Sequence, residues 1–551
     1  MDGVLYNYVS LLFVLFICSY IVKTITKKLF SYRTGVRVQH PPSPPALPII
    51  GHLHLLVGSS FSKTIHSLAT RHGPVLQLYM GASTCILVSS ADFAKEILKT
   101  QELNFVSRPE FAYSNYSIYF GSDFTFAPYG THWRFLKKLC MTRLLSTSQL
   151  NQFIPIREQE IMKLLEYLIS VSREEESCDL GTPLTTLMNN VICRTAMSTS
   201  LSDNNTDEAK KIKELVEEMQ VAGEMLCVGD ILGPLGKFDL LGYGRKLKKA
   251  IGKFDQLVEN IMKKHEDQNE TGEIRSGQGK DLMDVLLETS NDPSAEVKLT
   301  RKDVKAFFLD LFFAGTNTSS VAMKWAIAEL INHPQVYKKL RQEIQSVVGH
   351  SRLIKESDVQ NLPYLQAVVK ETLRLHPPTI TTIRQSSEDC KINGFYLMAK
   401  SRVIINLYSI MRDPSNWNNP DEFIPERFMA NSDDLNSNLD FMEMKGQNFD
   451  YLPFGSGRRA CPGASLALTM IHATVGALVQ CFDWKVKDGE LVDMREASGF
   501  GISMEMANPL VCYPVTKFNP FKKVTDAVDG AAGMSTTKQN HDCKNQEIKS
   551  N

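Results

Sequence analysis

Residues 454–463 place a single cysteine in a setting that leaves few choices for the local fold. The sequence FGSGRRACPG contains three glycines, two arginines and one proline around Cys461. Glycine allows positive backbone φ angles and lets the backbone approach a flat partner closely. Proline suits the first position of a helix, and the residues after Pro462 have helical periodicity. We therefore expect a glycine-rich loop that ends at Cys461, directly before a helix that begins at Pro462.

The same surroundings favour a thiolate at Cys461. The amino end of a helix and nearby cations both stabilise the anion relative to the thiol, and Arg458 and Arg459 come shortly before the cysteine. A thiolate on a loop lined by glycine suits a metal whose other ligands come from a cofactor.

Other interpretations of this loop are less satisfactory. GSGRRA also fits the relaxed dinucleotide fingerprint G-x-G-x-x-A, with Asp483 as a candidate ribose acid, but Pro462 would then fall inside the helix. A protease-type cysteine needs a histidine base, and no nearby residue identifies one. A purely structural cysteine leaves the glycines and arginines unexplained.

The net charge and the cysteine spacing argue against a nucleic-acid-binding protein and against a zinc or CxxC site. The chain of 551 residues has 61 lysines and arginines and 61 aspartates and glutamates, so no net field would attract nucleic acid or an acidic substrate. Its eleven cysteines form no CxxC pair and no cluster with histidine at zinc spacing. We expect mostly buried, reduced thiols in a reducing compartment.

The amino terminus differs from the rest of the chain. Residues 3–22 carry no charge and, as a helix, are long enough to cross a bilayer core of about 30 Å. A secretory signal is the alternative, but the apolar part is too long and no small-residue cleavage site follows. Lysines and arginines follow without an intervening acid, which predicts a single-pass anchor with the remaining chain in the cytosol.

Three regions follow the anchor. Residues 23–48 are basic and then rich in proline, which predicts an extended, semi-rigid hinge. Residues 49–521 contain no repeat and no second break in composition, so we expect one globular body. Residues 522–551 are polar, rich in small residues and without aromatic side chains, which predicts a disordered tail.

The globular body has a mainly helical pattern. Apolar residues recur at spacings of three and four in residues 156–176 and 208–226. Residues 75–80, 84–90 and 402–410 are short and rich in β-branched and aromatic residues, which is typical of strands. The fold class expected is mainly α with small β-sheets.

One long helix is expected to cross the core. It begins at Thr300, which with Asp303 forms a capping box, and ends at Asn332 before a His-Pro pair. In its middle, AGTNTSS (314–320) replaces apolar residues by Gly315 and hydroxyl residues, which are poor helix formers. One interpretation is a bend eased by hydroxyls bonded to the preceding turn. The other is a polar groove that faces a buried cofactor.

Two segments carry charged residues that can pair. Glu371 and Arg374 share one face of the helix in PYLQAVVKETLRLHPP (363–378). Arg427 follows in the proline-bracketed segment DEFIPERF (421–428). A buried bidentate pair completed by Arg427 is one interpretation, and a solvated surface bridge of little energetic value is the other.

Taken together, these segments resemble the cytochrome P450 family. Its haem signature F-x-x-G-x-R-x-C-x-G is matched at every position, by Phe454, Gly457, Arg459, Cys461 and Gly463. Its E-x-x-R and P-E-R-F elements are matched by Glu371, Arg374 and Arg427, and AGTNTS matches its oxygen-activation helix. The resemblance covers residues 1–521. Within the family the chain is similar to plant microsomal enzymes related to flavonoid, isoflavonoid and triterpenoid oxidases, for example in APYGTHWRFLKKLC and PFGSGRRACPGASLAL.

The resemblance implies a P450 fold and a haem-thiolate site. Cys461 would be the proximal ligand of the iron of haem b, with Phe454 beside its loop. The haem propionates would be held by Arg459, Arg384, Trp133 and Lys137. Many relatives have arginine where this chain has Lys137, which offers a point charge in place of a planar fork. The Glu371, Arg374 and Arg427 set would be structural.

The resemblance also places Asn317 and Thr318 on the oxygen side of the haem. The family usually has Asp or Glu at the position of Asn317, where the acid relays protons to bound dioxygen. An amide cannot shuttle protons by ionising, but it can position a water. We expect a working but altered relay that uses ordered water or a substrate hydroxyl, which makes Thr318 more important. Neutral drift at a tolerant position is the alternative.

The implied reaction inserts one oxygen atom of O2 into the substrate and releases the other as water. Electrons would come from NADPH through a membrane-bound NADPH-cytochrome P450 reductase, with cytochrome b5 as an optional second partner. No nicotinamide site and no nucleic-acid partner are expected in this chain. The anchor would hold the enzyme in the endoplasmic reticulum membrane, beside its reductase and lipid-soluble substrates.

By the same resemblance, five segments would line the substrate pocket: residues 111–126, part of 221–238, 309–317, 379–382 and 500–502. Their side chains are apolar, hydroxylated or aromatic, with few formal charges, so a hydrophobic polycyclic substrate of flavonoid or triterpenoid type fits better than an acidic one. Two other functions are compatible with a haem-thiolate chain. One is an isomerase or dehydratase without external O2, and the other is a catalytically poor scaffold that gathers pathway enzymes on the membrane.

Overall fold

The structure is a computed structural model, which describes residues 39–522 apart from 49, 57–59, 82, 199–210, 212, 213, 216, 220, 223–238, 240, 241, 272–279, 430–445 and 499–502. The predicted anchor at 3–22, most of the hinge, the tail beyond residue 522 and most of the helix expected at 208–226 lie outside the described residues.

Helices are the main regular structure of the described chain. They are α2 (Phe61–His72), α3 (Ala91–Lys95), α4 (Glu102–Phe105), α5 (Thr131–Leu139), α6 (Thr147–Gln152), α7 (Ile154–Arg173), α8 (Gly181–Met197), α10 (Tyr243–Thr271), α11 (Leu282–Asn291), α12 (Arg301–Gly315), α13 (Asn317–Asn332), α14 (Pro334–Val348), α15 (Pro363–Leu375), α16 (Leu407–Ile410) and α17 (Ala464–Cys481). The strands are β1 (Val75–Met80), β2 (Ser83–Val88), β3 (Cys178–Asp179), β4 (Thr381–Gln385), β5 (Cys390–Ile392), β6 (Phe395–Leu397), β7 (Arg402–Asn406), β8 (Phe482–Lys485) and β9 (Val511–Thr516). The expectation of a mainly helical fold with small sheets is confirmed.

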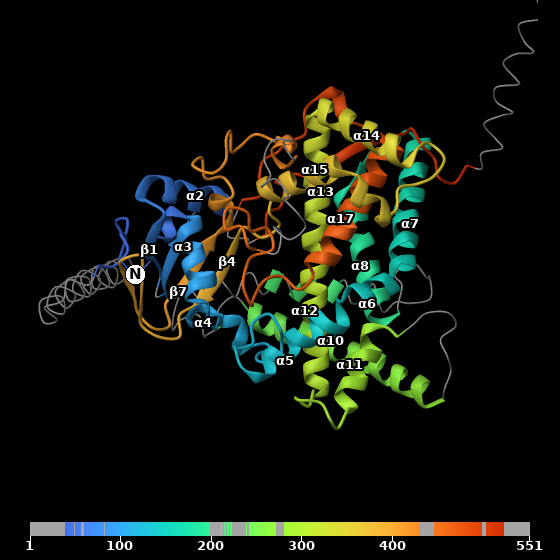
Figure 1. The fold of residues 1–551 in the computed structure, drawn as a ribbon. Helices are drawn as coiled ribbons and strands as arrows, with labels where there is room; N and C mark the ends of the chain where they lie inside the picture. Colours follow the sequence, from blue (N-terminus) through green and yellow to red (C-terminus); the bar gives the residue numbers. More distant parts are fainter. Residues whose placement is uncertain are drawn as a thin grey trace, which may run out of the picture.

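The largest sheet has four strands in the order β1-β2-β7-β4. The central pair β2 and β7 is parallel, with Ile86 opposite Val403 and Leu87 opposite Ile404, and the outer pairs are antiparallel. These strands are rich in valine and isoleucine, whose branched side chains pack well on the buried face of a sheet. Figure 1 shows this sheet with α2 and α3 on one side of the molecule and the larger helical part on the other.

One strand is shorter than its sequence predicts. Residues 402–410 were expected to be a single strand, but β7 ends at Asn406 and the last residues form α16. Asn406 causes the change of direction, because its side chain accepts a hydrogen bond from Ser409 N at 3.1 Å and caps the new helix.

The long helix is present and broken in the middle. The predicted capping box between Thr300 and Asp303 is formed, and the helical segment ends at Asn332. The helix is interrupted at Thr316, which separates α12 from α13. Thr318 Oγ1 donates to the carbonyl of Ala314 at 2.6 Å, so a hydroxyl does bond to the preceding turn at the break. Both halves lie along one column in the helical part (Figure 1).

Helix α17 follows the cysteine loop into the core. It contacts α13, α14 and α15 and is lined by buried side chains such as Met470, Leu478 and Val479. Within the described part of the chain it is also the one helix that is long and apolar enough to cross a membrane, but 78% of it is buried inside the protein. Its apolar composition is therefore explained by its place in the core.

Candidate active site around Cys461

The cysteine loop depends on two glycines with positive φ. Gly455 has φ 69° and Gly457 has φ 72°, a region that disfavours other residues. A Cβ atom at Gly457 would lie 2.5 Å from Glu102 Oε1 and 2.7 Å from the carbonyl of Leu98, so the loop packs too closely against the backbone just before α4 for any side chain. The loop closes when Cys461 N donates to the carbonyl of Phe454 at 3.0 Å. The sequence prediction of close backbone packing at the glycines is confirmed for Gly457.

The helix after the cysteine begins later than expected. Gly463 is the N-cap of α17 and Ala464 its first residue, whereas Pro462 lies in the preceding turn. Cys461 is therefore close to the helix amino end but not adjacent to it. The backbone N–H of Gly463 points at the sulfur and lowers the thiol pKa.

Burial, however, is the larger influence on Cys461. The side chain is accessible to solvent, yet the surrounding protein desolvates it and raises the pKa of the thiol, and Lys137 and the Gly463 N–H offset only part of this. The expected help from Arg458 is wrong, because Arg458 points to Glu102 and forms an ion pair with it. A bound cation, which stabilises the thiolate directly, would reverse this balance.

Three arginines gather beside the loop. Arg384 on β4 is 2% exposed, and its Nη1 atom donates to Thr382 Oγ1 at 2.6 Å and to the carbonyl of Ile383 at 3.0 Å. Burial first, and then the charges of Arg108 and Arg459, hold the pKa of Arg384 well below its usual range. Burial and Arg108 likewise lower the pKa of Arg459 to about 9.

Among the described residues this arginine group forms no direct ion pair, although the charges of Asp123 and Asp310 act on Arg108 from a greater distance. Arg459 donates to the backbone carbonyls of Val106 at 3.0 Å and Ala127 at 2.5 Å. Arg108 donates to the carbonyl of Ile383 at 3.3 Å, while its Nε atom is buried without a hydrogen-bond partner among the described residues. Buried like charges are costly unless an anion compensates them. The group therefore suits a ligand that carries carboxylates, which arginine binds in a planar fork.

Helix α5 adds a tryptophan and a lysine on one face. Trp133 is buried, its Nε1 donates to the carbonyl of Phe124 at 3.0 Å, and the guanidinium carbon of Arg459 lies 4.2 Å from its ring centre. Lys137, one turn later, donates to the carbonyl of Ala460 at 2.9 Å. Burial lowers the pKa of Lys137. These contacts link α5 to the cysteine loop.

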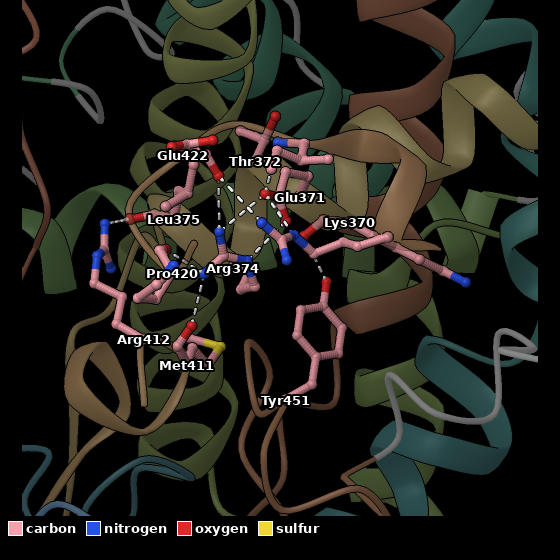
Figure 2. Close-up of polar contacts among 12 residues, drawn as sticks. Lys370, Glu371, Thr372, Arg374, Leu375, Met411, Arg412, Pro420, Glu422 and Tyr451 are labelled. Carbon is pink, nitrogen blue, oxygen red and sulfur yellow. Dashed lines mark hydrogen bonds and ion pairs between the residues drawn. The ribbon is translucent and has the colours of Figure 1, made fainter. Parts of the chain in front are cut away.

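Glu371, Arg374 and Arg427 form a buried ion-pair group. Arg374 donates to Glu371 from Nε at 2.7 Å and from Nη2 at 2.9 Å, and Arg427 Nε donates to the same carboxylate at 3.0 Å. Figure 2 shows Arg374 also reaching the carbonyls of Met411 and Pro420, at 2.9 and 2.7 Å. The surface-bridge interpretation is therefore wrong, and the buried bidentate pair completed by Arg427 is confirmed.

Comparison with known proteins decides the family. The family model described as Cytochrome P450 matches residues 41–513. The chain belongs to the cytochrome P450 family. It is 43% identical to 3,9-dihydroxypterocarpan 6A-monooxygenase of Glycine max, over 93% of this chain and 99% of the relative. It is 41% identical to beta-amyrin 24-hydroxylase of Glycine max, over 94% of this chain and 99% of the relative.

Solved structures show the same fold. A zebra fish cytochrome P450 with progesterone superposes with a TM-score of 0.68 at 24% identity, over 83% of this chain and 99% of that chain. A zebra fish cytochrome P450 structure with abiraterone gives a TM-score of 0.67 over the same shares. This P450 is accordingly a monooxygenase that uses haem b and electrons passed from NADPH through a reductase.

The side chains present in this P450 fit a haem. A cysteine that is exposed to solvent meets the need for a thiolate ligand. The glycines of the loop permit a flat partner, and the buried arginines lack the carboxylates that two propionates would supply. A cavity of about 10 Å³, room for about one water molecule, lies against Arg384, Arg459 and Glu102.

The oxygen-side residues lie at the helix break. Asn317 is the first residue of α13 and Thr318 follows it. Ala314 is exposed in the middle of a stretch that is otherwise largely buried, so this face of α12 borders an accessible space. Asn317 Nδ2 donates to Oε1 of Glu505 at 3.0 Å, a contact that no local sequence pattern indicates.

Sequence reasoning missed two further residues near this site. Arg108 belongs to the arginine group, but it lies in a loop without periodicity and nothing in its neighbours marks it. Asp310 on α12 accepts hydrogen bonds from Phe124 N at 2.5 Å and Thr125 N at 3.3 Å. Burial and the charge of Asp123 raise the pKa of Asp310 to about 7. An isolated acid in an apolar helix segment was the signal that could have identified Asp310.

Proposed function

We propose that this cytochrome P450 hydroxylates a hydrophobic, polycyclic plant metabolite of flavonoid or triterpenoid type. The overall reaction is R–H + O2 + NADPH + H⁺ → R–OH + H2O + NADP⁺. The main support is similarity over more than nine-tenths of the chain to two enzymes whose names specify such compounds, 3,9-dihydroxypterocarpan and beta-amyrin.

Cys461 is the residue we assign as the iron ligand. The haem bound there supplies the activation of O2 that no amino-acid side chain can provide. Phe454, Gly457 and Gly463 would shape the loop that holds the haem.

The arginine group would hold the haem propionates. Arg459 and Arg384 are the assigned cations, Trp133 and Lys137 complete the set from α5, and Arg108 joins it because its Nε is buried next to them. Two carboxylates in this place would relieve the repulsion between Arg384, Arg108 and Arg459.

Asn317 and Thr318 would serve the oxygen side of the haem. The Thr318 hydroxyl donates to the carbonyl of Ala314, and as a hydroxyl it can accept from a water at the same time. Asn317 contributes an amide that orients water but cannot ionise. These residues would guide protons to the reacting oxygen without holding a charge themselves.

The substrate pocket would be largely apolar. Phe111 and Phe126 lie with ring centres 6.0 Å apart in an edge-to-face arrangement, and residue 379 pairs with residue 503 at an isolated bridge. Residues 500–502 and most of 221–238, also expected at the pocket, lie outside the described residues. Aromatic and apolar walls favour a lipid-soluble ring system over an acid.

The membrane and the reductase complete the proposal. Residues 3–22 would form a single anchor in the endoplasmic reticulum membrane, with the catalytic domain in the cytosol beside NADPH-cytochrome P450 reductase. The hinge reaches the body directly, because the carbonyl of Gln39 accepts from Tyr396 N at 2.8 Å and that of Pro42 from Gln77 N at 2.8 Å. A short tether of this kind would keep the pocket close to the lipid.

Microsomes that contain the protein and its reductase would test the substrate class. They would be incubated with 3,9-dihydroxypterocarpan and with beta-amyrin, with and without NADPH, and the products identified by mass spectrometry. We expect NADPH-dependent addition of one oxygen atom to at least one of the two probes. No product from either probe, with a normal carbon monoxide spectrum, would contradict the proposed substrate class. Product formation without NADPH would instead support an isomerase or dehydratase.

A further inference from the structure

A distant segment brings a carboxylate to the helix break. Glu505 Oε1 accepts from Asn317 Nδ2 at 3.0 Å, and Glu505 Oε2 accepts from Lys324 Nζ at 2.8 Å. The carboxylate thus bridges the first and second turns of α13. The Lys324 side chain is 15% exposed and that of Glu505 is 34% exposed, so the ion pair is partly shielded from water.

Glu505 is held in place by its backbone. The indole Nε1 of Trp325 on α13 donates to the carbonyl of Met504 at 2.7 Å, and Met504 N donates to the carbonyl of Pro378 at 3.1 Å. The carbonyl of Glu505 itself accepts from Ala497 N at 2.9 Å. After the acid, Ala507 N donates to the carbonyl of Arg495 at 2.8 Å. These bonds fix the segment on both sides of Glu505, so its contact with Asn317 is built into the fold.

The contact dictates how the Asn317 amide is turned. An ionised carboxylate only accepts hydrogen bonds, so Asn317 must present its NH2 group to Glu505. Its Oδ1 atom then points to the other side of the amide and is left to accept from a water or hydroxyl. Lys324 donates a charge-assisted hydrogen bond to the other carboxylate oxygen, Oε2, and so holds Oε1 toward Asn317.

We propose that Glu505, in the C-terminal segment, supplies the carboxylate that α13 lacks because it has an amide at Asn317. Glu505 is a positioning residue: it fixes the amide of Asn317 so that Oδ1 is turned away from Glu505 and can accept from a water shared with the hydroxyl of Thr318. Lys324 holds Glu505. The inference rests on the monooxygenase activity of this site and concerns how the chain conducts protons to it.

Exchange of the two groups tests the proposal. Glu505→Gln removes the charge and lets the amide of Asn317 adopt either orientation, because glutamine both donates and accepts. Asn317→Asp places two carboxylates about 3 Å apart, so one must take up a proton as the pKa of the pair rises. The double variant Asn317→Asp with Glu505→Gln restores one acid and one amide, with the positions exchanged. Asp493→Asn is the matched control, since its side chain is also 34% exposed and pairs with Arg495 instead of α13.

The first measurement is how much product is formed and how much peroxide is released for each NADPH consumed. It is made over a range of pH, with 3,9-dihydroxypterocarpan or beta-amyrin, whichever the enzyme oxidises. We expect product per NADPH to fall roughly tenfold in Glu505→Gln, which is typical when an outer residue that orients a metal site is lost. Asn317→Asp should show a similar fall that varies with pH, the double variant should recover most of the coupling, and the control should match the wild type. If all folded variants formed the same amount of product per NADPH, the proposal would be overturned. The monooxygenase assignment would stand in that case, because product would still be formed.

The second measurement needs no substrate. Thermal unfolding of the haem-containing proteins should show that Asn317→Asp becomes less stable relative to the wild type as pH rises, because the folded state binds an extra proton that it must lose. The double variant should lack this dependence. Identical pH profiles for the single and double variants would contradict the contact between residues 317 and 505, whatever the substrate.

Discussion

Arg374 and Glu371 form a two-pronged ion pair with no exposed side-chain surface on either residue, at N–O distances of 2.7 and 2.9 Å. The remaining donors of Arg374 reach backbone carbonyls, including those of Met411 and Pro420 (Figure 2). Arg427 adds a second cation to the same carboxylate. Each member of the group satisfies the buried charge of another, so removing one residue leaves the others buried without a partner.

Glu371→Gln should therefore destabilise the protein severely. The variant leaves Arg374 and Arg427 buried without their anion, and breaking a buried pair in this way costs about 3–5 kcal/mol. The urea concentration at which the haem-thiolate spectrum is lost reports the change. The control is Glu296→Gln, which breaks the exposed pair with Lys138 and should cost less than about 1 kcal/mol. Equal sensitivity of the two variants to urea would show that the buried group is not structural.

Asp310 should make stability depend on pH. Burial, and then the charge of Asp123, raise the pKa of Asp310 from 3.8 to about 7. The folded state therefore holds a proton that the unfolded state has already lost, and stability must fall as pH rises from about 4 to 7. Asp310→Asn, which keeps an acceptor for Phe124 N, should flatten this part of the profile. Unfolding midpoints at a series of pH values would measure it, and parallel profiles would refute the raised pKa.

Thr318→Ala should uncouple the enzyme without unfolding it. Within the part of the chain that the structure describes, the Thr318 hydroxyl bonds only to the carbonyl of Ala314 in the preceding turn, and alanine is the better helix former, so the unfolding midpoint should not change. Product per NADPH should fall and released peroxide should rise, because the oxygen side loses its hydroxyl. Thr186→Ala removes the same kind of bond, from Thr186 Oγ1 to the carbonyl of Thr182, on α8 and should change neither quantity. Unchanged coupling in Thr318→Ala would show that protons reach the site by another route.

Residues 3–22 should be dispensable for haem binding. A variant that lacks residues 1–22 keeps Gln39 and Pro42, whose carbonyls bond to the body, so the catalytic domain should still fold. It should lose integral membrane insertion, which extraction of membranes with carbonate would show. Retention of the shortened protein after that wash would contradict a single anchor, although apolar loops can still bind the surface peripherally.

The parts of this site that are local in sequence could be predicted. The capping box at Thr300, the break at Thr316 and the glycine turns before Cys461 each follow from residues a few positions apart. Helical spacing predicted that Glu371 can pair with Arg374, but it left open whether the pair is buried or exposed, because burial depends on the segment around Arg427.

What could not be predicted depends on distant contacts. Arg108 joins Arg384 and Arg459 only because the loop before α5 folds against β4, and Glu505 meets Asn317 across 188 positions. Arg458 failed in the opposite way: its nearness to Cys461 in sequence favoured a role at the thiolate, but α4 offers it the carboxylate of Glu102. A charged side chain pairs with an opposite charge that is close in space, and the order of residues in the sequence does not show which charge that is.

The central claim is that Cys461 binds the haem iron as a thiolate. The most direct test is the absorption spectrum of the reduced protein with carbon monoxide, for the wild type and for Cys461→Ser at equal haem content. The account predicts that the wild type shows the band for which the family is named and that Cys461→Ser lacks it while the protein remains folded by circular dichroism. An unchanged band in the folded Cys461→Ser variant would contradict the assignment of the iron ligand.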